Sequence, residues 1–171
     1  LGGNNRIVVR DSAGKYLSEF GETGEGPGQF ASVHALAMGP QGNLFVLDRD
    51  LLRIQNFKQT ATPGSSNYPT YEHEATWADL GMPLDILVSE DSAWVTDLNP
   101  PKIVQFNLDG TRKYTWNLPV EGPHRWIEMH SLSVDSDGNL YGTDNQAGRP
   151  QKLTPRTDAD PDLILGKAYV P

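Results

Sequence analysis

The sequence predicts an all-β chain of repeated four-stranded antiparallel units, the architecture of a β-propeller. The first observation is a repeat: the stretch His34–Asp48 recurs as His130–Asp144, with the same 14-residue step from histidine to aspartate. A third copy, Leu84–Asp97, has one residue deleted and leucine in place of the histidine. A repeat with a fixed period indicates an array of one supersecondary unit.

The second observation is a strand pattern that follows these stretches at spacings of 47, 49 and 47 residues. Its four copies are Arg6-Ile-Val-Val, Arg53-Ile-Gln-Asn-Phe, Lys102-Ile-Val-Gln-Phe and Arg149-Pro-Gln-Lys-Leu. The third is composition: 37% of the residues are apolar and 13 are proline, which suits a turn-rich β protein.

The first residues are interpreted as part of an incomplete blade. We expect two strands, Arg6–Arg10 and Tyr16–Phe20, joined by a turn that contains glycine. They are the outer two strands of a blade whose first two strands are absent from this chain. Residues 21–30 are Gly-rich and link to the next blade. No strand-to-helix pattern adjoins them, so they are not interpreted as a phosphate loop.

The second blade has the clearest strand pattern. The strands expected here are Ala35–Met38, Leu44–Leu47, Arg53–Phe57 and, as the outer strand, Thr76–Leu80. Gly39–Asn43 forms the first turn, because glycine and proline supply the backbone angles of a tight reversal. Gln59–His73 is rich in Thr, Ser, Pro and Asn and is expected to be a surface loop.

The remaining chain supplies two further blades. The third blade has Lys113–Trp116 as its outer strand. In the last blade, only the run that begins at Leu163 offers residues typical of an outer strand. We therefore expect a single partial propeller over residues 1–171. Its parts are residues 1–30 (outer strands and linker), 31–81 (a blade), 82–119 (a blade) and 120–171 (the last blade and tail).

This count, about three to three and a half blades, is below the four to eight of single-chain propellers. An open array leaves strand edges that invite pairing. We expect either a fragment of a larger propeller or a subunit whose ring is closed by a homodimer, the Arg6–Phe20 hairpin of one copy completing the Ser131–Tyr141 strand pair of another.

Composition excludes several classes of function. The net charge is −8 and the pI near 4.8, and an acidic surface repels phosphate backbones, so nucleic acid is not an expected partner. The sequence contains no apolar run long enough to predict a membrane span. The absence of cysteine excludes disulfides and thiolate chemistry. The chain starts at Leu1, without methionine or a signal-like segment, so we expect a processed protein or a piece of a longer one.

The stretch from Phe20 to Phe57 resembles the NHL-repeat family of β-propellers. The residues that carry the resemblance are Gly26-Pro27-Gly28-Gln29-Phe30, His34, Gly42-Asn43-Leu44-Phe45-Val46, Asp48-Arg49 and Arg53-Ile54-Gln55. Within that family the chain is most similar to the six-bladed peptidyl-α-hydroxyglycine α-amidating lyase domain and its bacterial relatives. The features are a histidine that opens the first strand of alternate blades and Asp-Arg after a second strand. The resemblance implies the C-terminal half to two-thirds of a ring.

The resemblance also implies a site. His34 and His130 match two of three zinc-ligating histidines in the central channel, and Arg49 matches a catalytic arginine that binds substrate. The third histidine would precede Leu1, and the family's catalytic tyrosine would fall near Gly2, where there is none. Zinc is therefore the implied cofactor. Calcium is less favoured, because serine stands at position 131 where the family has a calcium-binding aspartate.

Each of these residues also has a purely structural interpretation. His34 and His130 could be channel-lining groups bonded to water, since catalytic zinc takes three protein ligands. Arg49 could bind a carboxylate in bidentate fashion or pair with Asp48 or Asp50. Asp48, Asp97 and Asp144 end every second strand, which favours a structural role. His73 and His124 are expected in loops. The four tryptophans are expected to fill space between blades.

Two functions remain open at this stage, and so does the question of enzymatic activity. The first is metal-dependent cleavage of a hydroxyglycine-extended peptide to a peptide amide and glyoxylate, or an inactive relative of such a lyase. The second is a propeller that binds a peptide, protein or small-molecule ligand in its channel without chemistry. The resemblance favours an extracellular or periplasmic location and a bacterial source.

Overall fold

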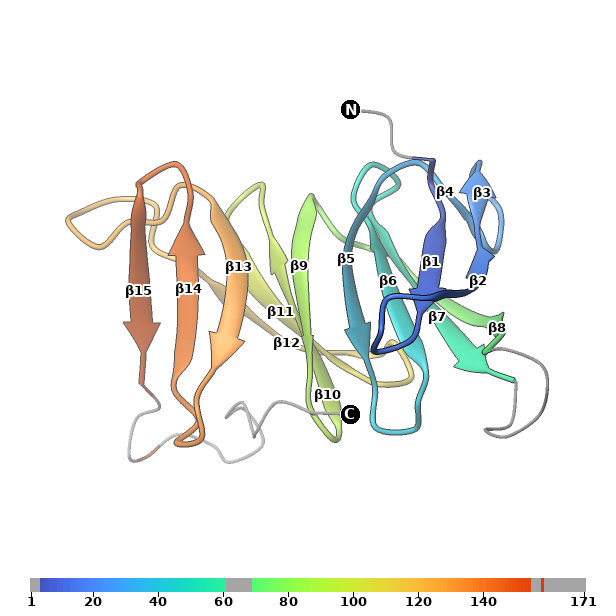
Figure 1. Cartoon of the computed structure of the whole chain (residues 1–171). Helices are drawn as coiled ribbons and strands as arrows, with labels where there is room; N and C mark the ends of the chain where they lie inside the picture. Colours follow the sequence, from blue (N-terminus) through green and yellow to red (C-terminus); the bar gives the residue numbers. More distant parts are fainter. Residues whose placement is uncertain (1–3, 61–68, 155–157, 159–171) are drawn as a thin grey trace.

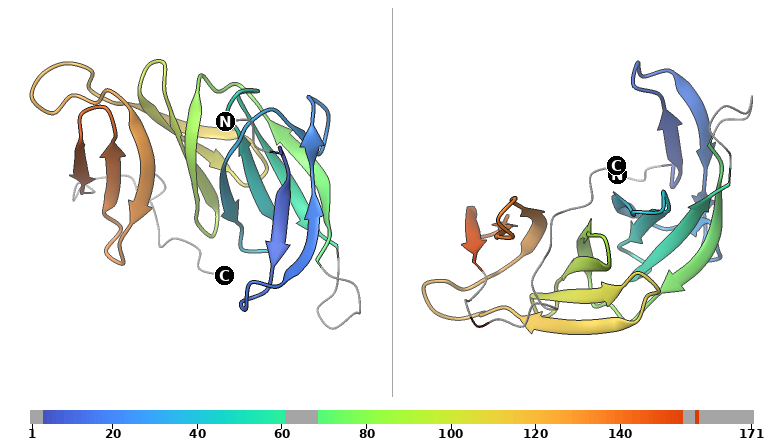
Figure 2. Two further views of the ribbon diagram at one scale, coloured as in Figure 1. Left: turned by 45° about the horizontal axis from the view of Figure 1, so that its top comes forward. Right: turned by 90° about the horizontal axis from the view of Figure 1, so that it is seen from below.

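The computed structural model describes residues 4–60, 69–154 and 158. Their strands form sheets that follow one another around an open arc (Figures 1 and 2). A two-stranded hairpin lies at one end of the arc, two four-stranded sheets occupy the middle, and a three-stranded sheet ends it. The described residues are all-β, as predicted, and hold about three propeller blades.

The first sheet is the predicted hairpin of an incomplete blade. Strand β1 (Ile7–Arg10) pairs antiparallel with β2 (Tyr16–Phe20), and the Asp11 carboxylate closes their turn by accepting the amides of Ala13 and Lys15. The link that follows is more ordered than expected. It contains a short parallel pair, β3 (Glu22–Thr23) with β4 (Gln29–Phe30).

The second blade is the sheet β5-β6-β7-β8. Its strands are β5 (Val33–Met38), β6 (Leu44–Asp48), β7 (Arg53–Gln59) and β8 (Tyr71–Trp77). The outer strand therefore begins five residues before the predicted Thr76, and the expected loop is shorter, with residues 61–68 outside the described part. The prediction of a loop at His73 was wrong, because alternate residues of β8 pack inward while its charged residues face out.

The third blade is the sheet β9-β10-β11-β12, with successive strands joined as antiparallel neighbours. Its strands are β9 (Pro83–Val88), β10 (Ser92–Asp97), β11 (Lys102–Asn107) and β12 (Arg112–Asn117). Every residue of β10 is buried, because this strand has a packed blade on both sides. The predicted outer strand at Lys113–Trp116 is confirmed.

The last sheet has three described strands, β13 (Met129–Val134), β14 (Leu140–Asp144) and β15 (Arg149–Leu153). β15 already pairs with β14, in register from Leu140 with Leu153 to Asp144 with Arg149. A closing strand would therefore meet the edge of β15 and not the β13–β14 pair alone. The outer strand predicted near Leu163 lies outside the described residues.

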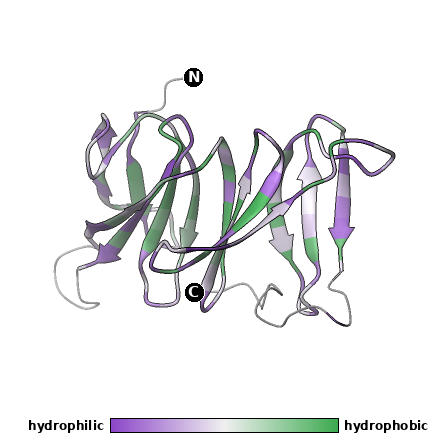
Figure 3. Cartoon of the chain, turned by 180° about the vertical axis from the view of Figure 1, so that it is seen from behind, coloured by the Kyte–Doolittle hydropathy of each residue, from purple (hydrophilic) through white to green (hydrophobic). Residues whose placement is uncertain are grey.

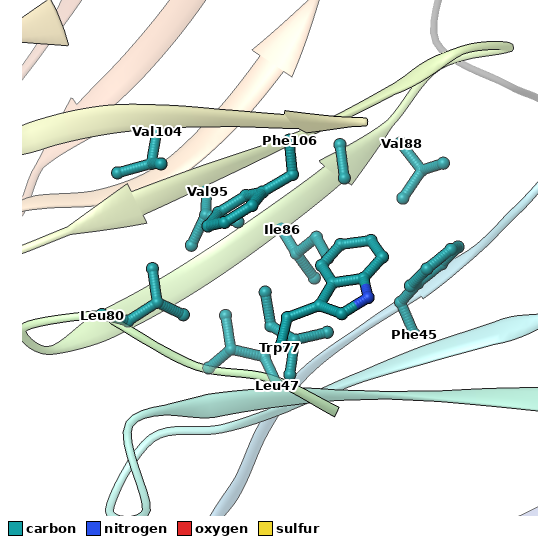
Figure 4. Close-up of a cluster of buried hydrophobic side chains, with 11 residues drawn as sticks. Phe45, Leu47, Trp77, Leu80, Ile86, Val88, Val95, Val104 and Phe106 are labelled. Atoms are coloured by element: carbon teal, nitrogen blue, oxygen red, sulfur yellow. The ribbon is translucent and has the colours of Figure 1, made fainter. Parts of the chain in front are cut away.

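Three hydrophobic clusters fill the spaces between consecutive sheets. The cluster between the second and third blades is centred on Trp77, whose ring stacks on Phe106 at a centroid distance of 5.6 Å (Figure 4). Hydrophobic residues (green in Figure 3) follow the strands in the middle of the arc, whereas β15, at the end, is mainly hydrophilic. The apolar contacts between neighbouring sheets thus fix their mutual orientation.

The recurring aspartates at the ends of the second strands, Asp48, Asp97 and Asp144, are structural, as predicted. Each buried carboxylate accepts amide N–H groups from the segment that enters the first strand of its own blade. Asp48 and Asp97 also pair with a cation at the start of the next strand, at 3.5 Å and 3.0 Å. These bonds hold the entrance of each first strand in place, which is where the two channel histidines stand.

The part of the chain that the structure describes holds no helix with the length and hydrophobicity that a bilayer crossing needs.

Candidate functional site

The concave side of the arc is lined by the first strand of each blade, β5, β9 and β13 (Figure 2). In each of these strands the pairing register shifts at the second residue, so the beginning of the strand is not regularly paired. The second residue is His34 in β5, Leu84 in β9 and His130 in β13. Alternate blades therefore carry a histidine at the same structural position.

The structure brings His34 and His130 together. Their ring centroids are 5.5 Å apart and the planes meet edge-on at 76°. They come from non-adjacent blades, and β9 passes between their strands. Both residues are half-buried, so the imidazoles are accessible from the concave side. Two side chains 96 positions apart in sequence thus form one small polar site.

The ring of His34 is oriented by the neighbouring blade. Its Nδ1 lies 2.6 Å from the carbonyl oxygen of Leu84. A carbonyl oxygen only accepts hydrogen bonds, so Nδ1 must carry the proton in this contact. In the neutral imidazole the lone pair is then on Nε2, which is the atom available to a metal or a substrate proton.

The ring of His130 is oriented by a carboxylate. Its Nδ1 lies 3.1 Å from Oε1 of Glu128, which faces little solvent. Glu128 is itself held by the side-chain amides of Asn145 and Gln146, at 3.0 Å and 3.1 Å. The carboxylate accepts the Nδ1 proton and again leaves Nε2 free. Histidines that bind metals in proteins usually have this kind of carboxylate or carbonyl partner on the other ring nitrogen.

A third polar group, Asp85, lies beside the pair. Its Oδ2 accepts the amide of Leu132 in β13 and its Oδ1 accepts the amide of Ile86, each at 2.9 Å. Burial raises the pKa of the Asp85 carboxyl above its ordinary value, while these two amides and the nearby imidazoles of His130 and His34 oppose the rise. The site therefore contains two imidazoles and one partly buried carboxyl group.

The donor set fits zinc only in part. Two imidazoles with free Nε2 atoms suit zinc or another ion that favours nitrogen ligands. However, among the described residues no group of three or more His, Asp or Glu side chains is arranged to hold one metal ion. The carboxylate oxygens of Asp85 are engaged with backbone amides. The described residues thus place two imidazoles close together without a third ligand beside them.

Arg49 stands directly after β6 and is about one-third exposed. Its Nε donates to Oδ1 of Asp50 at 2.9 Å, an exposed pair of neighbouring residues. No contact of Arg49 with His34 or His130 is among its described interactions. The surface ion pair predicted as one alternative is therefore present, and the binding of a carboxylate stays a prediction.

The other histidines stand apart from this site. His73 lies on the outer strand β8, with its Nε2 2.8 Å from Oγ1 of Thr76 and its ring edge-on to Phe57. His124 is exposed in the segment between the third and fourth blades. The tryptophans occupy the spaces between blades, as predicted: Trp77 belongs to one core cluster, and Trp94, Trp116 and Trp126 to another.

Asp85 and Glu128 were not anticipated from the sequence. Asp85 occupies the repeat position that holds Ala35 in one blade and Ser131 in the next, so the repeat itself gave no reason to single it out. A charged residue inside the apolar run Leu-Asp-Ile-Leu-Val was the available signal. Glu128 stands two residues before His130, a spacing that places two side chains on the same face of an extended segment, and this spacing was the available signal.

Comparisons in sequence give short matches. No family model matches the chain. The peptidyl-glycine alpha-amidating monooxygenase of Mus musculus is 45% identical over 60 residues, which cover 32% of this chain and 6% of that protein. The Rattus norvegicus protein is 43% identical over 60 residues, with the same coverage. The chain thus matches only a small part of the length of these curated relatives.

Comparisons in structure cover most of the chain. A protein of unknown function from Bacteroides caccae superposes with a TM-score of 0.64 at 16% identity, over 86% of this chain and 55% of that one. The β-propeller domain of Cps50 from Myceliophteria thermophila gives 0.60 at 14%, over 87% and 44%. Streptogramin B lyase gives 0.59 at 19%, over 91% and 49%.

The chain therefore spans about half the length of the solved structures it resembles. At these identities the likeness shows the fold alone, and it agrees with the arc of four-stranded antiparallel sheets. The chain has the β-propeller fold, with about three blades.

Proposed function

We propose that this chain is part of a propeller lyase of the α-amidating type, which cleaves a hydroxyglycine-extended peptide to a peptide amide and glyoxylate. The observation that carries the proposal is the convergence of His34 and His130, 5.5 Å apart, with both Nδ1 atoms engaged. The short match to the mouse and rat amidating proteins supports it.

In this proposal His34 and His130 would hold zinc through their Nε2 atoms. Leu84 and Glu128 keep the opposite ring nitrogens protonated, which fixes the tautomer and the direction of each lone pair. A bound zinc ion would supply Lewis-acid polarisation of a substrate oxygen. Because catalytic zinc usually takes three protein ligands, the third comes from outside the described residues.

The reaction needs no oxidant. The bond between the amide nitrogen and the hydroxylated carbon breaks, the hydroxyl oxygen loses its proton and becomes the aldehyde oxygen of glyoxylate, and the amide nitrogen gains a proton. Arg49 would bind the carboxylate of the hydroxyglycine through two parallel hydrogen bonds. To do so its guanidinium must leave Asp50, which is a small cost for an exposed ion pair.

A second candidate function is non-catalytic binding of a peptide or small molecule on the concave side. It is favoured by two observations: the guanidinium of Arg49 is engaged with Asp50, and the described residues form no group of three metal ligands. In this case the imidazoles and Asp85 would act as hydrogen-bonding groups for the ligand.

Metal content is the first test. The purified protein is dialysed against zinc and its bound metal is measured by mass spectrometry. We expect bound zinc in the wild-type protein and in His73→Ala, whose histidine lies on an outer strand, but not in His34→Ala or His130→Ala. Zinc binding that survives both channel substitutions would contradict the proposed site.

Activity is the second test. The zinc-loaded protein is incubated with a peptide that ends in α-hydroxyglycine, and glyoxylate release is compared with the uncatalysed background. Arg49→Ala should raise KM, whereas Arg6→Ala, which removes another exposed ion-paired arginine, should not. Zinc binding without accelerated glyoxylate release would favour the second candidate function.

A further inference from the structure

We propose that Asp85 is the positioning residue of the site formed by His34 and His130. Together with Leu84, it joins the strands of the two histidines across the blade between them. The inference concerns the apo protein as well as a metal-bound form, and it rests on the proposed function only for its effect on zinc. Neither the repeat nor the resemblance assigns a role to this position.

The first half of the link joins β9 to the strand of His34. The carbonyl oxygen of Leu84 accepts the Nδ1 proton of His34 at 2.6 Å. The same peptide group leads directly into Asp85, whose own amide donates to Oγ1 of Thr96 at 2.9 Å. Thr96 is completely buried in β10, so the backbone at Leu84 and Asp85 is held from the blade interior.

The second half joins β9 to the strand of His130. Oδ2 of Asp85 accepts the amide of Leu132, two residues after His130, at 2.9 Å. Oδ1 accepts the amide of Ile86, also at 2.9 Å, which fixes the carboxylate against its own strand. One side chain therefore satisfies an amide on each of two neighbouring first strands. Within the described residues, these bonds are the polar links between β5, β9 and β13.

A polar link between the two histidine strands has to pass through the third blade, which lies between them. Consecutive blades are separate sheets, so no backbone ladder connects β5 to β9 or β9 to β13. Among the described first strands, β9 is the neighbour of both histidine strands. The equivalent positions, Ala35 and Ser131, have no carboxylate. Asp85 thus fixes the position of β13 against β9, and the carbonyl group of Leu84 fixes the orientation of the His34 ring.

The charge of Asp85 adds an electrostatic contribution. A carboxylate close to two imidazoles attracts a cation between them. Removing the carboxylate should therefore change the site in two ways. It leaves the amide of Leu132 without its partner, which lets His130 move, and it removes a negative charge that attracts a cation.

Two substitutions remove these effects to different extents. Asp85→Asn keeps the shape and one acceptor oxygen, but it removes the charge and turns an NH₂ group toward one of the two amides, whereas Asp85→Ala removes the whole carboxylate. Asp109→Asn is the matched control, because Asp109 lies in the same blade, is exposed and also accepts a backbone amide, that of Thr111. If the Asp85→Ala variant does not fold, the comparison of Asp85→Asn with the wild type alone tests the inference.

The readout is the tautomer of each histidine in metal-free protein, from long-range ¹H–¹⁵N spectra of ¹⁵N-histidine-labelled samples. We expect His34 and His130 to carry the proton on Nδ1 in the wild type and in Asp109→Asn. In the Asp85 variants the His130 resonances should shift and its tautomers should mix. Wild-type tautomers and shifts in both Asp85 variants would overturn the inference.

Zinc affinity, by competition titration, is the second readout. Loss of a group that orients metal ligands typically weakens binding by about 10–100-fold, and we expect a loss in this range for Asp85→Ala and none for Asp109→Asn. If the wild type binds no zinc, the proposed metal function fails while the tautomer comparison still decides the role of Asp85. Zinc affinity unchanged in Asp85→Ala would count against the inference itself.

Discussion

Gly110, in the turn between β11 and β12, lies directly against the indole ring of Trp77 from the preceding blade. A β-carbon built at Gly110 would come within 3.0 Å of Cδ1 and Nε1 of Trp77, closer than real side chains approach. Gly110 also has a φ of +89°, which L-residues with a side chain rarely adopt. This glycine thus serves both a turn and the contact between two blades.

Gly110→Ala should therefore destabilise the protein for two reasons. The left-handed backbone costs about 1–2 kcal/mol, and the forced shift of a packed indole adds about 1–3 kcal/mol. Gly14→Ala is the control, since Gly14 has a φ of +81° but no atom near the position of its β-carbon. Urea unfolding should show a larger loss for Gly110→Ala. Equal losses would mean that Trp77 moves away freely.

A second prediction concerns the buried aspartate of the third blade. Asp97 accepts the amides of Gly81 and Met82 and pairs with Lys102 at 3.0 Å, with its side chain fully buried. Removing one partner of a buried pair leaves an uncompensated charge, so Asp97→Ala should lower the free energy of unfolding by about 3–5 kcal/mol.

Asp50→Ala provides the comparison, because Asp50 pairs with Arg49 on the surface. Its loss should change stability by less than about 1 kcal/mol. Both variants are compared by urea unfolding with fluorescence detection. An Asp97→Ala variant as stable as Asp50→Ala would show that the entrance of β9 is not held by this carboxylate.

A third prediction is the titration of Asp135 in the β13–β14 turn. Hydrogen bonds, above all from the Asn139 side chain and then from the Asn139 amide, Tyr141 and the Asp137 amide, lower the pKa of Asp135 to about 2. Because the pKa of Asp135 in the folded protein lies below the ordinary value of 3.8, ionised Asp135 stabilises the fold above about pH 4. This contribution is lost as the pH falls toward 2.

The carboxyl ¹³C resonance of Asp135, followed between pH 5 and 1.5, should report this low pKa (the pH limits are about those where titration starts and ends). Asn139→Ala should raise the pKa toward its ordinary value, since it removes the side-chain amide that contributes most to lowering it. Ser136→Ala, in the same turn and exposed, should leave it unchanged. An Asp135 that titrates near 4 in the wild type would contradict the turn geometry.

Much of this fold follows from repeated local signals. Gly42 and Gly110 adopt positive φ in the turns between antiparallel strands, as the turn sequences predict. The start of β8 was missed because Tyr71-Glu-His-Glu reads as a polar stretch. Its inward side chains are only half-buried, and it is the pairing with β7 that makes the segment a strand.

The site was less accessible to sequence reasoning than the fold. The shared repeat position of His34 and His130 predicts two groups on the same side of the arc, and the structure brings their rings to 5.5 Å. Glu128 stands only two residues before His130, but the repeat has no carboxylate at the equivalent positions, Ser32 and Met82. Asp85 could not be predicted, because its role depends on a bond between blades. Such bonds have no fixed sequence spacing, so the periodicity does not reveal them.

The last prediction concerns assembly. Among the described residues β1 pairs only with β2 and β15 only with β14, so each sheet presents an unpaired edge. Val8 in β1 and Leu36 in β5, the first strand of the next blade, are 40% and 48% exposed, and these two residues are the apolar surface considered at this end of the arc. Exposed strand edges beside apolar surface favour pairing with another chain. We propose that this other chain is a second copy of the same protein.

Light scattering coupled to size exclusion measures the mass of the assembly. We expect about twice the chain mass of 18.8 kDa at micromolar concentration. Val8→Lys and Leu36→Lys should each shift the protein toward the monomer, because a charge on this surface must be desolvated when it is covered. Tyr114→Lys is the control, as Tyr114 is similarly exposed but lies on the outer strand β12. A wild-type mass of 18.8 kDa, unchanged on concentration, would rule out association through these edges.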